Sequence, residues 1–407
     1  MKRWTPLILI FIILAGIVVS CEDDDNFWSS LIPETDEEPT QSQISGYIFK
    51  PAVEPATEEN VQHLKLPAGF KIQKFAEDLG ESRMMVVSDA GHVYVSYRKE
   101  GEVVLLEDND GDGVAERQET VANIEQAHGL AIHEGRLYIV AVREVYAAEI
   151  NPEGTLGEIQ MLTDALPDGG QHPNRTIEFG PDGMMYISVG STCNSCPEPN
   201  EMNATIVRAD ADAQNITIFA KGLRNTIGFG WHPTTNDMWG MDHGIDWLGD
   251  TEQKEELNKL EEGADYGWPY IFGEGKYNPG DRPPGDMTYQ EYLEKTNLPA
   301  LTYTAHAAPM DMVFYTADQF PEEYREDAFV AMRGSWNRSD PVGYKVVRLR
   351  FENGEPTAFE DFLTGFLIKE KKAHFGRLAG LAVHTDGSLL VSDDTNGVIY
   401  RISYENQ

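Results

Sequence analysis

The feature that most constrains the fold is a short phrase of sequence that recurs along the chain. Each copy has a polar residue, an apolar segment with alternating character, a turn that is often Asp-Gly, and a second apolar segment. The copies are spaced by roughly 45–60 residues, a period typical of repeat architectures. Six copies lie near residues 82–97, 127–142, 174–190, 224–242, 309–332 and 377–394.

Short alternating segments separated by turn residues predict β-strands, and long helical periodicity is scarce. We therefore predict an all-β fold, a six-bladed β-propeller with one four-stranded antiparallel blade for each copy and an insertion near 250–300. Blades bury their faces against their neighbours, so the ring is stable only when it is complete. A tandem of β-sandwiches is the main alternative, but the regular recurrence of Asp-Gly turns favours the propeller.

Composition sets the broad class of the protein. The chain has 407 residues, of which 41% are hydrophobic, so it can bury a large core. Its formal net charge is −36 and no basic stripe offsets it, which argues against nucleic acid as a partner. With only 3 Cys, it is not a scaffold built on disulfides.

The N-terminus has the features of a targeting segment. Lys2 and Arg3 precede an apolar run that is too short to span a membrane comfortably, and the run ends at Cys21. Since the tetrapeptide VVSC resembles a bacterial lipoprotein signal, we expect 1–20 to be a signal peptide and Cys21 to carry a lipid. An ordinary signal peptide or anchor helix with an incidental Cys is the alternative.

The rest of the chain divides into two parts. Residues 21–60 are acidic and rich in Pro, Thr, Glu and Gln, a composition that predicts a flexible tether. Residues 61–407 would form the propeller domain. We expect the protein in the cell envelope of a Gram-negative bacterium, lipid-anchored to a membrane and either periplasmic or on the outer-membrane surface.

Several phrases in this order resemble the soluble sugar dehydrogenases that use pyrroloquinoline quinone (PQQ), in particular the sorbosone and aldose dehydrogenase branch. The resemblance implies a PQQ- and calcium-dependent oxidation of an aldose or sugar aldehyde, with a quinone or a cytochrome as electron acceptor. It places the cofactor on one face of the ring, near the axis. The phrases are LPAGFKIQKFA, HPNRTIEFGPDGMMYISVGSTCNSC, GLRNTIGF, DHGIDWLGD, EEGADYGWPY, RGSWNRSDPVGYKVVRLRF and GRLAGLAVHTDGSLLVSDDTNGVIYRI.

The resemblance also implies roles for individual residues. His172 corresponds to the catalytic base, and a neutral imidazole can take a proton from a substrate hydroxyl. Arg224 and Asn225 would contact the quinone, where a guanidinium stabilises developing negative charge. An acidic neighbour that orients the base in some relatives is replaced by Gln171. Arg175 is either a ligand at the same end of the sheet or an exposed charge.

The cofactor's metal and its acid groups need further partners. Relatives hold calcium with two backbone carbonyls, which would be those of Gly244 and Ile245. Some relatives have Pro at the second position, so the backbone here is less constrained. Arg377, with Arg338 and Lys345, would clamp the carboxylates of the cofactor.

A second calcium site is predicted in an acidic loop. Asp108, Asp110, Asp112, Glu116 and Glu119 stand at positions 1, 3, 5, 9 and 12 of a calcium-loop pattern with Gly at position 6. Because the sequence predicts strands on both sides of the loop, we predict a structural calcium rather than a sensor. A solvated turn is the alternative.

Cys193 and Cys196 form a C-x-x-C pair, for which a disulfide is expected outside the cytoplasm if the geometry allows. Two other functions stay open. One is a calcium-dependent lactonase-type hydrolase, which would need several carboxylate and Asn ligands on the axis. The other is a non-catalytic propeller that binds glycans or proteins, because fold alone does not fix function.

Overall fold

The structure is a computed structural model that describes residue 46 and residues 48–405. The expected signal peptide over 1–20, Cys21 and most of the expected tether lie outside the described residues. Among the described residues, no helix has both the length and the apolar character that crossing a bilayer requires.

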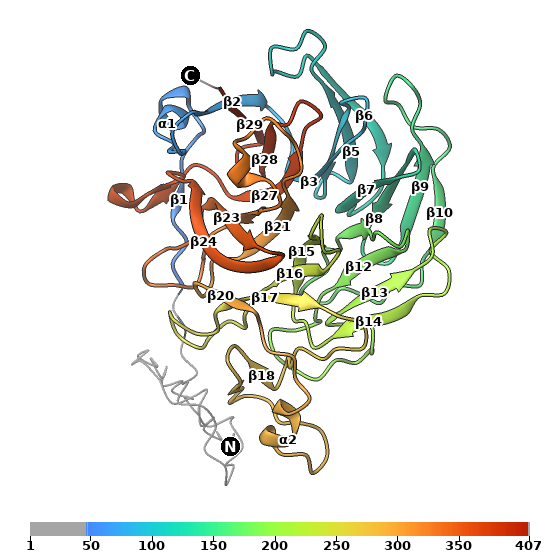
Figure 1. Ribbon diagram of the computed structural model, residues 1–407, viewed down its shortest axis with the longest axis vertical. Helices are drawn as coiled ribbons and strands as arrows, with labels where there is room; N and C mark the ends of the chain where they lie inside the picture. The colour runs from blue at the N-terminus through green and yellow to red at the C-terminus, as the bar shows by residue number, and fades with distance from the viewer. Residues whose placement is uncertain (1–45, 47, 406–407) are drawn as a thin grey trace, which may run out of the picture.

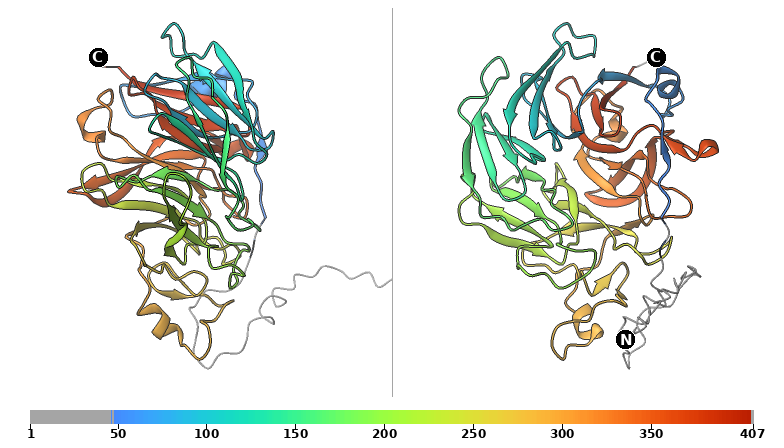
Figure 2. Two further views of the ribbon diagram at one scale, coloured as in Figure 1. Left: turned by 90° about the vertical axis from the view of Figure 1, so that its right-hand side faces the viewer. Right: turned by 180° about the vertical axis from the view of Figure 1, so that it is seen from behind.

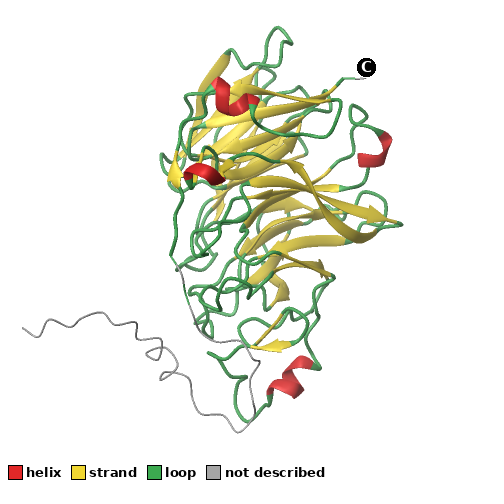
Figure 3. Ribbon diagram, turned by 90° about the vertical axis from the view of Figure 1, so that its left-hand side faces the viewer, coloured by secondary structure: helices red, strands yellow, loops and turns green. Residues whose placement is uncertain are grey.

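Strands dominate the described chain, and the few helices are short and peripheral (Figure 3). The first three sheets are four-stranded and antiparallel. They consist of β3 (Ser82–Val87), β4 (Val93–Tyr97), β5 (Glu102–Glu107) and β6 (Arg117–Asn123); β7 (Gly129–His133), β8 (Arg136–Val140), β9 (Val145–Glu149) and β10 (Gln160–Thr163); and β11 (Ile177–Phe179), β12 (Met185–Val189), β13 (Thr205–Ala209) and β14 (Thr217–Lys221).

Three further sheets have the same four-stranded antiparallel form. They consist of β15 (Thr226–Trp231), β16 (Met238–Asp242), β17 (Glu255–Leu260) and β20 (Leu301–Tyr303); β21 (Pro309–Phe314), β22 (Ala328–Met332), β23 (Lys345–Glu352) and β24 (Glu355–Leu363); and β27 (Leu378–Val383), β28 (Leu389–Asp393), β29 (Val398–Tyr404) and β2 (Phe70–Ala76). The all-β prediction and its four-stranded antiparallel units are confirmed.

The six sheets are arranged around a common centre (Figure 1). The first strands of neighbouring sheets contact one another: β3 with β7, β7 with β11, β15 with β21, β21 with β27, and β27 with β3, while β12 contacts β15. The ring closes through β2, which comes from the start of the folded chain and pairs with β29 from its end. Removal of either end would therefore open the last sheet.

Glycines in the first strands let neighbouring sheets approach closely. A methyl group added at Gly129 would lie 2.7 Å from the carbonyl oxygen of Arg175, and one at Gly380 would lie 2.2 Å from that of Arg83. Both distances are below van der Waals contact, so a side chain at either position would push two sheets apart. These glycines occupy matching positions in the recurring phrase, in HGLAI and LAGLAV.

Apolar clusters fill the spaces between sheets. Between the last sheet and the first, Phe75, Val95, Leu390 and Ile399 are all nearly inaccessible to solvent. Full burial of one such side chain stabilises the fold by about 1.5–3 kcal/mol. Alternation along each strand thus gives every sheet an apolar surface for its neighbour.

The remaining elements lie outside the six sheets. The expected insertion near 250–300 leaves the fourth sheet between β17 and β20 and projects from the ring (Figures 1 and 2). It contains β18 (Ile271–Phe272), β19 (Lys276–Tyr277) and α2 (Tyr289–Leu293). The other small elements are β1 (Ala52–Val53), α1 (Glu58–Gln62), β25 (Leu367–Ile368), β26 (Ala373–His374) and two 3-10 turns, Glu322–Tyr324 and Lys369–Lys371.

Part of the segment expected as a tether is packed on the ring. β1 pairs in parallel with β26, and the amide N–H of Phe49 donates to the carbonyl oxygen of Trp336 at 3.0 Å. The chain from Ile48 to residue 60 therefore runs along the folded domain rather than away from it.

Candidate active site

The candidate active site lies at one end of the sheets, where first strands begin and second strands end. These strand ends bring loops from four sheets around a cavity of about 270 Å³. The residues that line it include His172, Arg224, Gly244 and Arg377, which the sequence analysis predicted, together with His243, His306 and Arg333, which it did not.

His172 is held in one orientation by Ser191. Its Nδ1 lies 2.9 Å from the carbonyl oxygen of Ser191 and 2.8 Å from the hydroxyl oxygen of the same residue. A carbonyl can only accept, so Nδ1 carries the hydrogen and Nε2 is the unprotonated nitrogen. The Ser191 hydroxyl donates in turn to the carbonyl oxygen of Cys193 at 2.8 Å. Ser191 thus orients the imidazole, although Gln171 rather than an acidic residue precedes it.

The surroundings keep this imidazole neutral. Burial, together with the positive charge of Arg224 and the neighbouring His243, lowers the pKa of His172 to about 2. Arg175, whose role the sequence left open, is fully buried, and its Nη1 donates to the carbonyl oxygen of His172 at 2.9 Å. It is therefore a structural support of the loop that carries His172.

Arg224 and Asn225 are fixed by one buried carboxylate. The two oxygens of Asp242 accept from the backbone N–H of Arg224 at 2.9 Å and from that of Asn225 at 2.8 Å. The hydroxyl of Thr226 donates to the same group at 2.8 Å. Arg224 lines the cavity, whereas Asn225 is buried just behind it, with its side-chain oxygen next to Gly190.

A loop between two cysteines holds the guanidinium of Arg224. Nε of Arg224 donates to the carbonyl oxygen of Asn194 at 2.9 Å, and Nη2 donates to Oδ1 of Asn194 at 2.8 Å. The structure has a disulfide between Cys193 and Cys196, and Asn194 lies between these two cysteines in the chain. The segment 191–196 therefore orients both His172 and Arg224.

Gly244 and Ile245 follow β16, as the predicted metal position requires. Gly244 lines the cavity, and its N–H donates to the buried carboxylate of Glu255 at 3.0 Å. The N–H of Ile245 donates to the side-chain amide oxygen Oε1 of Gln253 at 3.1 Å. Because these side chains occupy the N–H groups, the backbone of this turn is fixed although no proline is present. The carbonyl ligands remain a prediction.

Arg377 and Arg333 bring two more positive charges to the cavity. Arg377 precedes β27, and its Nη2 donates to the carbonyl oxygen of Gly334 at 3.1 Å. Burial, with the charge of Arg333, lowers the pKa of Arg377 to about 10, so Arg377 is charged at neutral pH. Arg333 directly follows β22, as His243 follows β16. Alignment of the repeats could have identified Arg333, because the residue after each second strand reaches this end of the ring.

The structure does not bring Arg338 and Lys345 to the cavity. Arg338 donates to the carbonyl oxygens of Asp340 at 3.0 Å and Ala305 at 3.2 Å, which anchors a loop. Lys345 lies on β23 and pairs with Asp361 at 2.7 Å. Arg333, five residues before Arg338 in the same phrase, lines the cavity instead.

The acidic loop lies at the rim, between β5 and β6. Side-chain oxygens of Asp108, Asp110, Asp112 and Glu116 lie within 4.8 Å of one another, which is close enough to surround one cation. Glu119 is outside this group, because it pairs with Arg117 at 2.6 Å. The structure therefore brings together four of the five predicted ligands, and calcium there remains a prediction.

Known proteins resemble this chain in sequence. The sequence model of the glucose/sorbosone dehydrogenase family matches residues 83–401. An uncharacterized protein of Borreliella burgdorferi is 30% identical over 368 residues, which cover 86% of this chain and 93% of that protein. A pyrroloquinoline quinone-dependent sugar dehydrogenase of Hypocrea jecorina is 25% identical, with 78% of this chain and 82% of that protein covered.

Solved structures show the same fold. The calcium structure of a Trichoderma reesei enzyme of carbohydrate-active family AA12 superposes with a TM-score of 0.71 at 22% identity and covers 84% of this chain and 97% of that chain. The holo form of the PQQ domain of Coprinopsis cinerea pyranose dehydrogenase gives 0.72 at 21% identity, with coverage of 86% and 98%. The family match spans all six sheets from Arg83 onward, and the chain belongs to the glucose/sorbosone dehydrogenase family.

Proposed function

We propose that this protein is a PQQ- and calcium-dependent dehydrogenase that oxidises an aldose or a sugar aldehyde, and that its six sheets are the blades of a β-propeller. One observation carries the proposal. Nδ1 of His172 donates to Ser191, so the unprotonated Nε2 is left for the cavity that Arg224, Arg333 and Arg377 also line.

The residues present fit an anionic, planar cofactor. Three guanidinium groups line one cavity in a chain whose formal net charge is −36, and Nε of Arg377 is buried without a hydrogen-bond partner among the described residues. Arginine suits the carboxylates of such a cofactor because its donors form a rigid fork. Arg333 and Arg377 would hold these groups, and Gly244 and Ile245 would face calcium. When bound, the pair would supply an electron-accepting quinone polarised by a Lewis acid.

The chain's own residues then bind and orient the sugar and move one proton. Nε2 of His172 accepts the proton of the substrate hydroxyl, and the Ser191 carbonyl stabilises the imidazolium that forms. Arg224 is preorganised by Asn194 and Asp242, so its charge needs no reorganisation when negative charge develops beside it.

The lactonase-type hydrolase is less well supported. The two carboxylates that line the cavity are Asp246 and Glu255, and both are engaged by protein groups. Asp246 accepts from Arg224 at 3.3 Å, while Glu255 accepts from the backbone N–H groups of Gly244 and Ala308. A calcium-dependent hydrolase would need such oxygens free for the metal. A purely binding role leaves the oriented base of His172 without a use.

We also propose the surroundings of the enzyme. A lipid on Cys21 would anchor it in the envelope of a Gram-negative bacterium, facing the periplasm or the outer surface. Electrons would leave through a soluble quinone or a separate cytochrome. The expected cleavage and lipid attachment can be checked by mass spectrometry of the protein purified from membranes.

The function is tested by reconstitution. Purified protein is incubated with PQQ and calcium, and reduction of a redox dye is followed with a panel of aldoses and sugar aldehydes. We expect dye reduction that needs the cofactor, the metal and a sugar together. Tight PQQ binding without oxidation of any sugar would reject the substrate class, and absence of PQQ binding would reject the redox proposal.

A further inference from the structure

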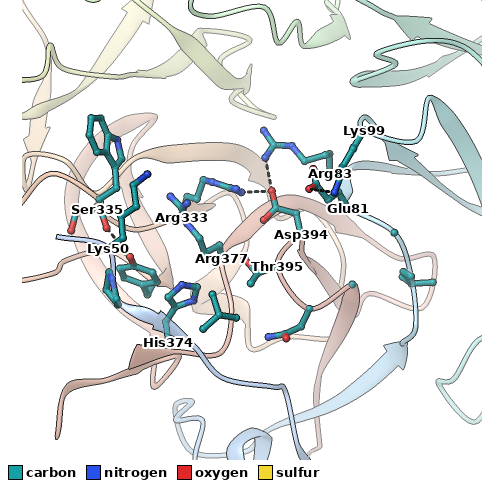
Figure 4. Close-up of a pocket in the computed structure, with 18 of the residues that line it drawn as sticks. Lys50, Glu81, Arg83, Lys99, Arg333, Ser335, His374, Arg377, Asp394 and Thr395 are labelled. Carbon is teal, nitrogen blue, oxygen red and sulfur yellow. Dashed lines mark hydrogen bonds and ion pairs between the residues drawn. The ribbon is translucent and has the colours of Figure 1, made fainter. Parts of the chain in front are cut away.

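The arginines of the catalytic cavity are supported in two different ways. Arg333 pairs with Asp394, which also accepts from Arg83, and Figure 4 shows the two guanidinium groups around this carboxylate. Arg83 lies in β3 and Asp394 directly follows β28, so the sheets themselves hold this group. The guanidinium of Arg224 donates instead to the irregular 191–196 loop. The placement of Arg224 therefore depends on how well this loop is fixed.

A disulfide closes the 191–196 loop. Cys193 and Cys196 are the two cysteines of the described chain, and they are three positions apart in sequence. The stabilising effect of a crosslink on a whole fold grows with the length of chain that it closes. A bridge as short as this one acts mainly on the geometry of the loop itself.

The loop has little support from its own backbone. In the described chain, no backbone N–H of residues 193–196 donates to a backbone carbonyl. Ser195 is held through its side chain, whose oxygen accepts from Nδ2 of Asn278 at 2.7 Å and donates to Asp281. The disulfide thus constrains a segment that has no regular secondary structure to fix it.

The loop contacts both residues that the proposed chemistry uses. The Ser191 hydroxyl lies 2.8 Å from Nδ1 of His172 and donates to the carbonyl oxygen of Cys193 at 2.8 Å. The N–H of Ser191 donates to the carbonyl oxygen of Arg224 at 2.8 Å. A shift of Cys193 would therefore be transmitted through Ser191 to His172 and Arg224.

Cys193 also packs beside the turn that is expected to face calcium. The apolar cluster that it contacts contains Ile245, together with Trp268 and Phe272 of the insertion. A broken S–S bond would free the Cys193 side chain to rotate and would change this packing. Both cysteines are partly exposed, so a thiol can reach the bridge from solvent.

We propose that the Cys193–Cys196 pair is a redox switch of the catalytic cavity. With the S–S bond intact, the loop holds His172 and Arg224 in the active arrangement. A dithiol breaks this bond by exchange: the dithiol is oxidised to its own disulfide, and its two hydrogens pass to the sulfurs of Cys193 and Cys196. The loop then loses its crosslink and turnover falls. This inference rests on the proposed function and names a means of regulating that site, in which the two cysteines are positioning residues.

The first test is turnover in the two redox states. The protein without PQQ is reduced with dithiothreitol, freed of the reagent under nitrogen, loaded with PQQ and calcium, and assayed by dye reduction. We expect reduction to lower kcat roughly tenfold, with a smaller change in KM, as when a hydrogen bond to a charged group is weakened. Treatment with oxidised glutathione should restore kcat. The matched control combines Cys193→Ala and Cys196→Ala, and it should have the kcat of the reduced parent and no response to dithiothreitol.

The second test needs neither PQQ nor activity. The ¹⁵N NMR shifts of the histidine rings are recorded for the protein without PQQ, and His172→Gln identifies the signal of His172. In the oxidised protein we expect one tautomer, with the hydrogen on Nδ1. Reduction should add the tautomer with the hydrogen on Nε2, because Ser191 no longer fixes the ring. Tm should fall by only about a few degrees, since the bridge closes a short loop.

The outcomes separate this inference from the proposed function. A His172 tautomer that responds to reduction, in a protein that oxidises no sugar, would support the switch and reject the proposed function. An unchanged tautomer after complete reduction, checked by mass spectrometry, would overturn the switch whatever the activity. A kcat that does not respond to reduction would also overturn it. Loss of the fold on reduction would do the same, because the bridge would then serve the whole domain.

Discussion

The catalytic cavity and the acidic rim loop are both built from polar residues, but their contacts reach over very different lengths of chain. In the loop, Asp108 accepts from N–H groups three and five residues away, and Glu116 accepts from one seven residues away. In the cavity, His172 contacts a residue 19 positions away and Arg224 one 30 positions away. The carboxylates of the loop are therefore held by local contacts, whereas the cavity exists only when the sheets are assembled.

This difference predicts that changes in the cavity have the larger effects on function. The largest is expected for His172→Ala, which removes the proton acceptor. General-base catalysis contributes a factor of about 10²–10⁴, so kcat in dye reduction should fall by this amount while PQQ affinity changes little. His63→Ala, an exposed histidine on the N-terminal segment, is the matched control and should keep full activity. Turnover at the parent rate by His172→Ala would show that another group is the base.

The second prediction concerns the 191–196 loop, which supports the cavity without carrying out chemistry. Asn194→Ala removes the oxygen that accepts from Nη2 of Arg224 at 2.8 Å and from the N–H of Asp246 at 2.9 Å. Since a hydrogen bond to a charged group contributes about 1.5–3 kcal/mol, we expect PQQ affinity or kcat to fall by about tenfold or more. Asn194→Asp keeps an acceptor and should restore much of the loss. An Ala variant with the parent's affinity and kcat would show that Arg224 does not depend on this loop.

The same contrast explains what the sequence could predict. The repeated strand and turn pattern is local, so the all-β fold, the sheet type and the insertion near 250–300 followed from it. His172, Arg224 and Arg377 precede the first strands of their sheets, and they do line one cavity. Lys345 is on a strand whose register points it to Asp361, and only pairing of β23 with β24 determines that. Ser191 and Asn194 act through backbone contacts between separate loops, for which the sequence carries no pattern.

The third prediction concerns the contribution of His172 to the pH dependence of stability. Burial, with Arg224 and His243, lowers the pKa of His172 to about 2, and an unfolded histidine titrates near 6.5. Between these values the unfolded chain binds a proton that the folded protein does not. His172 therefore reduces the free energy of unfolding as pH falls below about 6.5, by up to ~1.4 kcal/mol per pH unit.

His172→Gln removes this titration and keeps a polar side chain. In urea unfolding of the protein without cofactor, the stability of the parent relative to the variant should decrease by about 1–2 kcal/mol between pH 7 and pH 5. His63→Gln, at an exposed histidine outside the cavity, is the matched control for the loss of a histidine side chain. A difference between parent and His172→Gln that is the same at both pH values would mean that His172 titrates normally in the folded state.

The smallest effect is expected at the rim loop, because its four carboxylates are largely solvated and the loop is already closed by its own hydrogen bonds. In the protein without PQQ, calcium at about ten times its dissociation constant should raise Tm by only a few degrees, and Asp110→Asn should reduce that rise. Glu119→Gln is the informative control, since Glu119 pairs with Arg117 and lies outside the four-carboxylate group. An unchanged calcium response in Glu119→Gln would limit the site to the four grouped carboxylates. A lost response would mean that Glu119 leaves Arg117 to complete the twelve-residue pattern, and an unchanged response in Asp110→Asn would leave the loop a solvated turn.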